Sequence, residues 1–167
     1  LVKSMNGLLD ASLGQRQAMT LASIAFGEAA GEMGNFASSM QSVTNFEDDK
    51  LLSLMSKLSQ TFKLNKDEIQ QLVPVLLDFT EANKATGMSV ESAFDLMGRA
   101  LNGHTEMLGR YGIELDDTRL KTEGVSYLVE KLGEDYGGTA TALADLRLQN
   151  ANAWGDIQET VGDMLTT

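Results

Sequence analysis

The hydrophobic positions of this chain recur with the period of an α-helix almost from end to end. From about Gln15 to Val43, apolar and small residues are separated by gaps that alternate between three and four, which predicts one long helix with a coiled-coil-like heptad seam. The seam comprises Met19, Ala22, Phe26, Ala29, Met33, Phe36, Met40 and Val43. Few charged residues flank it and several glycines lie beside it, so this helix is not expected to be stable alone. The seam must be buried, either against helices of the same chain or, as a self-association surface, against further copies of it.

Capping residues predict where the following helices begin. Thr44, Asn65 and Ser89 each precede a new apolar stripe, and the first two stand three residues before a glutamate, which is the spacing of a capping box. Pro74 lies inside the second of these helices and is expected to kink or break it near Val73. Helix stops are expected at Gly87, Gly103 and Gly112.

The C-terminal third continues the helical pattern after one short interruption. Ile113 and Leu115 flank a polar residue with period two, so a short extended segment is expected at residues 113–115. A helix beginning at Thr122 should end at Gly137-Gly138, and a last helix should begin at about Thr139. Its expected buried residues are Leu143, Leu146, Trp154, Ile157, Val161 and Met164. The predicted fold is all-α, an elongated multi-helix bundle.

Composition agrees with a folded chain. Hydrophobic residues make up 43% and charged residues 22% of the 167 positions, and the single proline favours long helices. No linker rich in Gly, Ser or Pro divides the sequence. We distinguish residues 1–43, an Ala/Gly-rich helix and candidate for self-association, from residues 44–167, a helical module. Since the chain starts at Leu1, we expect it to be a fragment of a longer protein.

Charge narrows the classes of partner. The chain has 24 acidic and 13 basic residues, a net charge of −11, and the basic residues are scattered. Neither direct sequence-specific binding to nucleic acid nor electrostatic binding to an anionic membrane is expected. The most apolar window, Ala18 to Ala30, is interrupted by Glu28 and is too short to span a bilayer.

Few residues offer chemistry. Without cysteine there is no disulfide, thiolate zinc site or cysteine nucleophile, and His104, the single histidine, is interpreted as a solvated loop residue. The acidic pairs, such as Asp48 and Asp49, are adjacent and do not match a calcium loop. We therefore expect no cofactor, no metal and no catalytic residue.

One segment of the chain has an enzyme-like pattern. The segment beginning at Glu91, Glu-Ser-Ala-Phe-Asp, resembles the opening of lytic transglycosylases, in which the glutamate is the general acid. The residues that follow, Leu96-Met97-Gly98-Arg99, depart from that family. A position in the first turn of a helix also explains Glu91, because a carboxylate there complements the helix dipole. A peptidoglycan-cleaving domain is the alternative function, and a generic helical protein-binding module is another.

The segment from Thr80 to Asp117 resembles a recurrent part of the tail tape measure proteins of long-tailed bacteriophages and prophages. The matching pieces are Ala85, Gly87, Ser89, Glu91 and Ala93, then Ala100-Leu101-Asn102-Gly103, and then Leu108, Gly112, Ile113 and Leu115. Similar order and spacing extend from about residue 44 to residue 165, including Asn152-Ala153-Trp154-Gly155-Asp156.

This resemblance implies a structural virion protein and no enzyme. Members of the family form a long, mostly helical rod inside the tail tube, set tail length, contact the tail tip or baseplate hub, and leave when DNA is ejected. They act as homo-oligomers of several copies about the tail axis. The chain would then be one module of such a protein, made in the bacterial host cytoplasm and located in the tail of the virion.

Overall fold

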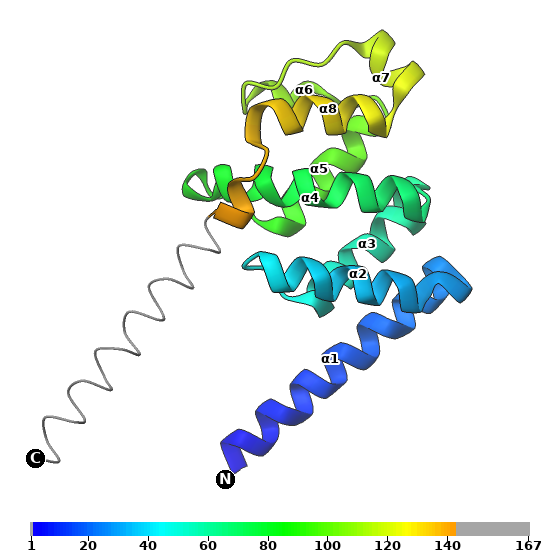
Figure 1. The fold of residues 1–167 in the computed structure, drawn as a ribbon, viewed down its shortest axis with the longest axis vertical. Coiled ribbons are helices and arrows are strands. Elements are labelled where there is room, and N and C mark those ends of the chain that lie inside the picture. The colour runs from blue at the N-terminus through cyan, green and yellow to red at the C-terminus, as the bar shows by residue number, and fades with distance from the viewer. Residues whose placement is uncertain (1, 143–167) are drawn as a thin grey trace, which may run out of the picture.

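A computed structural model describes residues 2–142, and every regular element in that range is a helix (Figure 1). The all-α prediction is therefore confirmed for this range. The elements are α1 (Val2–Phe26), η1 (Gly27–Ala29), α2 (Ala30–Val43), α3 (Asp48–Phe62), α4 (Lys66–Ala82), η2 (Lys84–Thr86), α5 (Val90–Leu101), α6 (Glu106–Gly109), α7 (Asp117–Glu123) and α8 (Val125–Tyr136). In Figure 1 the helices are stacked roughly in chain order along the long axis, from α1 at one end to α7 and α8 at the other.

The N-terminal helical region is long, as expected, but it bends sharply at Gly27. Helix α1 begins at Val2, well before Gln15, and ends at Phe26. Gly27 has a φ of 57°, which an L side chain rarely adopts and glycine adopts without strain. The short 3₁₀ helix η1 follows, and α2 then runs back beside the body of the protein (Figure 1). The predicted heptad seam is therefore divided between two helices.

Two of the three predicted caps are present. The side chain of Asn65 accepts a hydrogen bond from the backbone N–H of Glu68, whose carboxylate accepts one from the N–H of Asn65, both at 2.9 Å. The hydroxyl of Ser89 accepts from the N–H of Ser92 at 3.1 Å. The prediction for Thr44 was wrong, because its hydroxyl donates back to the Met40 carbonyl at 2.6 Å. Thr44 therefore provides a donor for a carbonyl in the last turn of α2 and does not cap α3, which begins at Asp48.

We expected Pro74 to kink or break its helix near Val73, and a break does not occur, because α4 is continuous from Lys66 to Ala82. Proline removes one helical hydrogen bond, and burial of the residues on either side outweighs this loss. Leu72, Val73 and Leu76 are all fully buried. Tertiary packing therefore keeps α4 continuous at Pro74.

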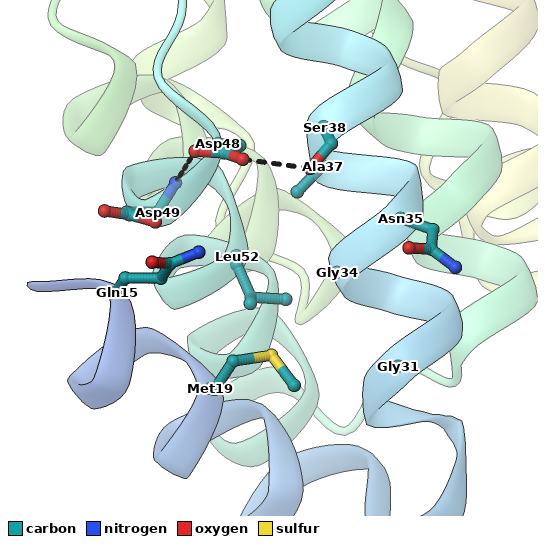
Figure 2. Close-up of a pocket in the computed structure, with 10 residues that line it drawn as sticks. All are labelled: Gln15, Met19, Gly31, Gly34, Asn35, Ala37, Ser38, Asp48, Asp49 and Leu52. Atoms are coloured by element: carbon teal, nitrogen blue, oxygen red, sulfur yellow. Dashed lines mark hydrogen bonds between the residues drawn. The ribbon is translucent and has the colours of Figure 1, made fainter. Parts of the chain in front are cut away.

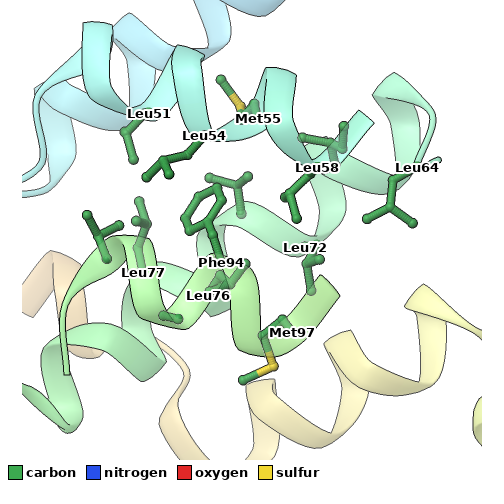
Figure 3. Packing of buried hydrophobic residues seen from close by; sticks show 14 of the residues in the cluster. Leu51, Leu54, Met55, Leu58, Leu64, Leu72, Leu76, Leu77, Phe94 and Met97 are labelled. Carbon is green, nitrogen blue, oxygen red and sulfur yellow. The ribbon is translucent and has the colours of Figure 1, made fainter. Parts of the chain in front are cut away.

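The centre of the core lies where α3, α4 and α5 meet (Figure 3). The side chains labelled there include Leu51, Leu54, Met55 and Leu58 from α3, Leu72, Leu76 and Leu77 from α4, and Phe94 and Met97 from α5. The same cluster continues into Ala18 and Ala22 of α1 and Met33 of α2. Residues on both sides of the expected boundary at position 43 thus contribute to one core.

A close helix contact depends on Gly98 of α5. A Cβ atom built at Gly98 would lie only 2.3 Å from ring carbons of Phe62, at the end of α3. The absence of a side chain at Gly98 allows the Phe62 ring to lie directly on the backbone of α5. Gly98 itself is buried.

The C-terminal layer consists mainly of α8 packed on α4. The predicted stops are present, since Gly87, Gly103 and Gly112 all have positive φ. Residues 113–116 belong to neither a helix nor a strand. The helix expected from Thr122 is instead two helices, α7 and α8, separated by Gly124, whose φ is 57°.

The carboxylate of Asp78 anchors the chain after α8. It accepts a hydrogen bond from the backbone N–H of Gly138 at 3.0 Å and another from that of Ala140 at 2.9 Å. Asp78 is 7% exposed, so both bonds are shielded from water. A helix begins at Thr139, as predicted. The apolar residues expected to be buried in this helix, from Leu143 to Met164, lie outside the described residues.

Candidate functional site

The N-terminal half of α1 has an exposed apolar surface. Met5, Leu8, Leu9 and Leu13 are each 58–72% exposed, and in Figure 1 this half of the helix extends away from the other helices. At 100° per residue, the four side chains fall on one side of the helix. We call them the α1 stripe. Clustered exposed apolar side chains of this kind mark interaction surfaces.

The second half of α1 packs against the body of the protein. Ala18 and Ala22 are buried, and their small side chains allow close approach to α2 and α3. Ser59 of α3 donates a hydrogen bond to the carbonyl of Ala25 at 3.5 Å. One helix is thus anchored along its C-terminal half and unpartnered, within the described residues, along its N-terminal half.

The eight predicted seam residues have different surroundings. Within the chain, Ala22 and Met33 are fully buried, so neither is accessible to a second copy in this arrangement. Met19 and Val43 are exposed, at 39% and 45%. The remaining four, Phe26, Ala29, Phe36 and Met40, are half-buried, and the two phenylalanines and Met40 pack against the chain's own core. The bend at Gly27 therefore prevents the eight from forming one straight seam.

A groove of about 310 Å³ lies between α1, α2 and the start of α3 (Figure 2). It is lined by Gln15, Met19, Gly31, Gly34, Asn35, Ala37, Ser38, Asp48, Asp49 and Leu52. The carboxylate of Asp48 accepts hydrogen bonds from the Ser38 hydroxyl and from the N–H of Asp49, both at 2.9 Å. Burial, with the nearby charges of Asp48 and Glu47, raises the pKa of Asp49. The groove thus has an acidic end and an apolar end.

An ion pair fixes α2 to α4. The ammonium of Lys66 lies 2.6 Å from a carboxylate oxygen of Glu32, and the amide of Gln70 donates to the other oxygen at 3.2 Å. The Lys66 hydrogen bond lowers the pKa of Glu32, and the same bond raises the pKa of Lys66. These contacts join the surface of α2 to the first turns of α4.

A second pocket, of about 460 Å³, contains Glu91. Its lining residues are Asn45, Phe46, Glu47, Lys50, Thr80, Glu81, Lys84, Met88, Ser89, Val90 and Glu91. The Lys50 ammonium lies 2.6 Å from the Glu91 carboxylate. The hydrogen bond from Lys50, followed by one from the backbone N–H of Glu91 itself, lowers the pKa of Glu91. A general acid needs the opposite shift, because it must be protonated near neutral pH.

Glu91→Gln is expected to reduce stability by less than about 1 kcal/mol at neutral pH, because the ion pair with Lys50 is half exposed. The native pKa is lowered from 4.5, so the carboxylate stabilises the fold above pH 4.5 and this contribution is lost as pH falls through the native value. Urea unfolding at several pH values should show the two proteins converging in acid. A difference that grows as the pH falls would contradict the ion-pair assignment.

His104 lies exposed between α5 and α6. Within residues 2–142, no group of three or more His, Cys, Asp and Glu side chains could hold a metal ion. In the same range, no helix combines the length and hydropathy needed to cross a membrane.

The α1 stripe was not predicted, because the first helix was expected to begin at about Gln15 and it begins at Val2. The signal was available, since Met5, Leu9 and Leu13 are spaced by four and Leu8 adjoins them. The buried polar residues Asp78 and Glu81 were also missed. Both lie within an apolar stretch of α4, and the sequence around them does not reveal their burial.

Comparisons of the chain with protein families, with curated proteins and with solved structures found no match.

Proposed function

We propose that this chain is a module of a bacteriophage or prophage tail tape measure protein, a structural component that sets tail length. The observation that carries the proposal is the α1 stripe, which has no partner among residues 2–142, on a helix that extends from an otherwise packed body. Projecting apolar helices of this kind can join several copies into a rod about one axis. The ordered motifs from residue 44 to residue 165 supply the resemblance to this family.

The proposed role is self-association through α1. Burying large apolar side chains of this kind contributes roughly 1.5–3 kcal/mol each, so several together favour association over exposure to water. The exposed members of the predicted seam, Met19 and Val43, are available to extend the contact, whereas Phe26 and Phe36 already contribute to the chain's own core. The interface is therefore centred on the α1 stripe. In the tail it would lie inside the tube, with the tube and tip proteins as further partners.

The experiment is to introduce charges into the α1 stripe and measure mass in solution. Wild-type protein is expected to form oligomers, and Leu9→Asp with Leu13→Asp is expected to shift it to monomer, because buried unpaired charges oppose association. Light scattering reports mass and circular dichroism reports folding, which should not change because both residues are exposed.

The matched control is Gly7→Asp with Ala11→Asp. It adds the same charge to the same helix at exposed positions on the side opposite the stripe, so the oligomer should persist. A wild-type chain that stays monomeric at high concentration would contradict self-association and favour the generic helical binding module. Clearance of peptidoglycan that is abolished by Glu91→Gln would instead favour the enzyme.

A further inference from the structure

Two buried oxygen atoms have no hydrogen-bond partner among the described residues, and both belong to residues that line the second pocket. They are the Oδ1 atom of Asn45 and the Oε1 atom of Glu81. The side chain of Glu81 is only 4% exposed. A buried acceptor without a donor costs free energy comparable to a lost hydrogen bond, and more when it is charged. Such a pair of acceptors indicates a missing donor.

The charges around the pocket favour a cationic donor. Three carboxylates line it, those of Glu47, Glu81 and Glu91, against the two ammonium groups of Lys50 and Lys84. Lys50 is already paired with Glu91 at 2.6 Å. Lys84 stands 3.9 Å from Glu81 Oε1, beyond hydrogen-bond distance, and its side chain is 69% exposed. The buried Glu81 carboxylate thus has one long ion pair, to an exposed ammonium group, and no hydrogen bond at its Oε1 atom.

The walls of the pocket suit an aliphatic chain. Met88 and Val90 are apolar and only 6% exposed, and Phe46 is a half-buried aromatic on the same pocket. A ligand with an apolar stem and a positively charged head would match these walls and the acceptors together. Arginine and lysine side chains have this form.

We propose that this pocket binds the side chain of an arginine residue of a partner polypeptide. A guanidinium has five N–H donors in a planar fork and can donate to a carboxylate and an amide oxygen at the same time. It is also more weakly hydrated than the ammonium of lysine, so burial costs it less. Glu81 Oε1 accepts the charge-assisted bond and Asn45 Oδ1 accepts a second one. This site is separate from the α1 stripe and does not depend on the proposed function.

The test is titration of the full chain with a short blocked peptide containing one arginine, followed by amide NMR and calorimetry. Saturable shifts are expected at amides that line the pocket, such as those of Lys84, Met88 and Ser89. The same peptide with citrulline, a neutral isostere of arginine, should bind at least about tenfold more weakly, since it lacks the charge. A lysine peptide should bind more weakly than the arginine peptide.

Variants separate the pocket from non-specific attraction to an acidic protein. Glu81→Gln should weaken the arginine peptide by about tenfold or more, and Asn45→Ala should weaken it by a smaller factor. Glu106→Gln removes the same charge from an exposed position outside the pocket and should not alter binding. If Glu81→Gln fails to fold, the Asn45→Ala variant and the citrulline peptide still test whether the pocket binds arginine. Equal binding of the arginine and citrulline peptides, or no saturable shift at the lining amides, would overturn the proposal.

Discussion

Replacement of Phe79 by alanine is expected to lower the free energy of unfolding by about 3–5 kcal/mol. Phe79 is fully buried on α4, and its ring makes two edge-to-face contacts. The centroid of Tyr111 lies 5.5 Å away at an interplanar angle of 80°, and that of Tyr136 lies 5.3 Å away at 78°. Removal of the ring would leave a cavity and cancel both aromatic contacts, each worth about 0.5–1.5 kcal/mol beyond burial.

Urea unfolding followed by circular dichroism measures this loss. Met107→Ala is the control, since Met107 is a large apolar residue that is 44% exposed, and a change within about 0.5 kcal/mol is expected there. Tyr136→Phe should have a small effect, because it keeps the ring and removes only a 3.3 Å hydrogen bond from the hydroxyl to the Tyr111 carbonyl. A loss below about 1 kcal/mol for Phe79→Ala would contradict the packing of α8 on α4.

Asp78→Ala is expected to destabilise the protein and release the start of the helix that follows α8. Hydrogen bonds to a buried charged group contribute about 1.5–3 kcal/mol each, and Asp78 makes two, to the N–H groups of Gly138 and Ala140. Without the carboxylate those N–H groups lose their acceptor. Amide hydrogen exchange at Gly138 and Ala140 should accelerate, together with a lower urea midpoint.

Asp78→Asn is expected to have an effect between those of wild type and Asp78→Ala. Its amide keeps one acceptor oxygen in nearly the same volume, so both effects should be smaller than those of alanine. Asp10→Ala, at an exposed position on α1, should leave the exchange of Gly138 and Ala140 unchanged. Unaltered exchange in the Asp78→Ala protein would show that this carboxylate does not hold the chain.

Local signals predicted much of the fold because they depend on neighbouring residues. The capping box at Asn65 needs only Glu68, three positions away, and it formed as expected. Thr44 had the same spacing, but its hydroxyl bonds the preceding helix instead. The spacing does not show whether the Thr44 hydroxyl caps the following helix or bonds to a carbonyl of α2. That choice depends on where α2 ends.

The bend at Gly27 was not predicted because a heptad pattern describes which side chains are apolar and not the direction of the backbone. Residues on both sides of the bend, such as Ala22 and Met33, enter the same core, so their pattern continues across it. The candidate sites could not be predicted in full, because they depend on contacts between residues that are far apart in the sequence. Asp78 binds backbone groups about sixty residues away, and the burial of Glu81 depends on the packing of its neighbours.

The contact between Gly98 and Phe62 couples two positions that are far apart in the sequence. Any residue with a side chain at position 98 would require either that the ring at position 62 move or that α3 and α5 separate. Among descendants of this sequence, a larger residue at 98 should therefore be accompanied by a smaller one at 62. The size of the residue at position 62 thus limits which residues position 98 can accept.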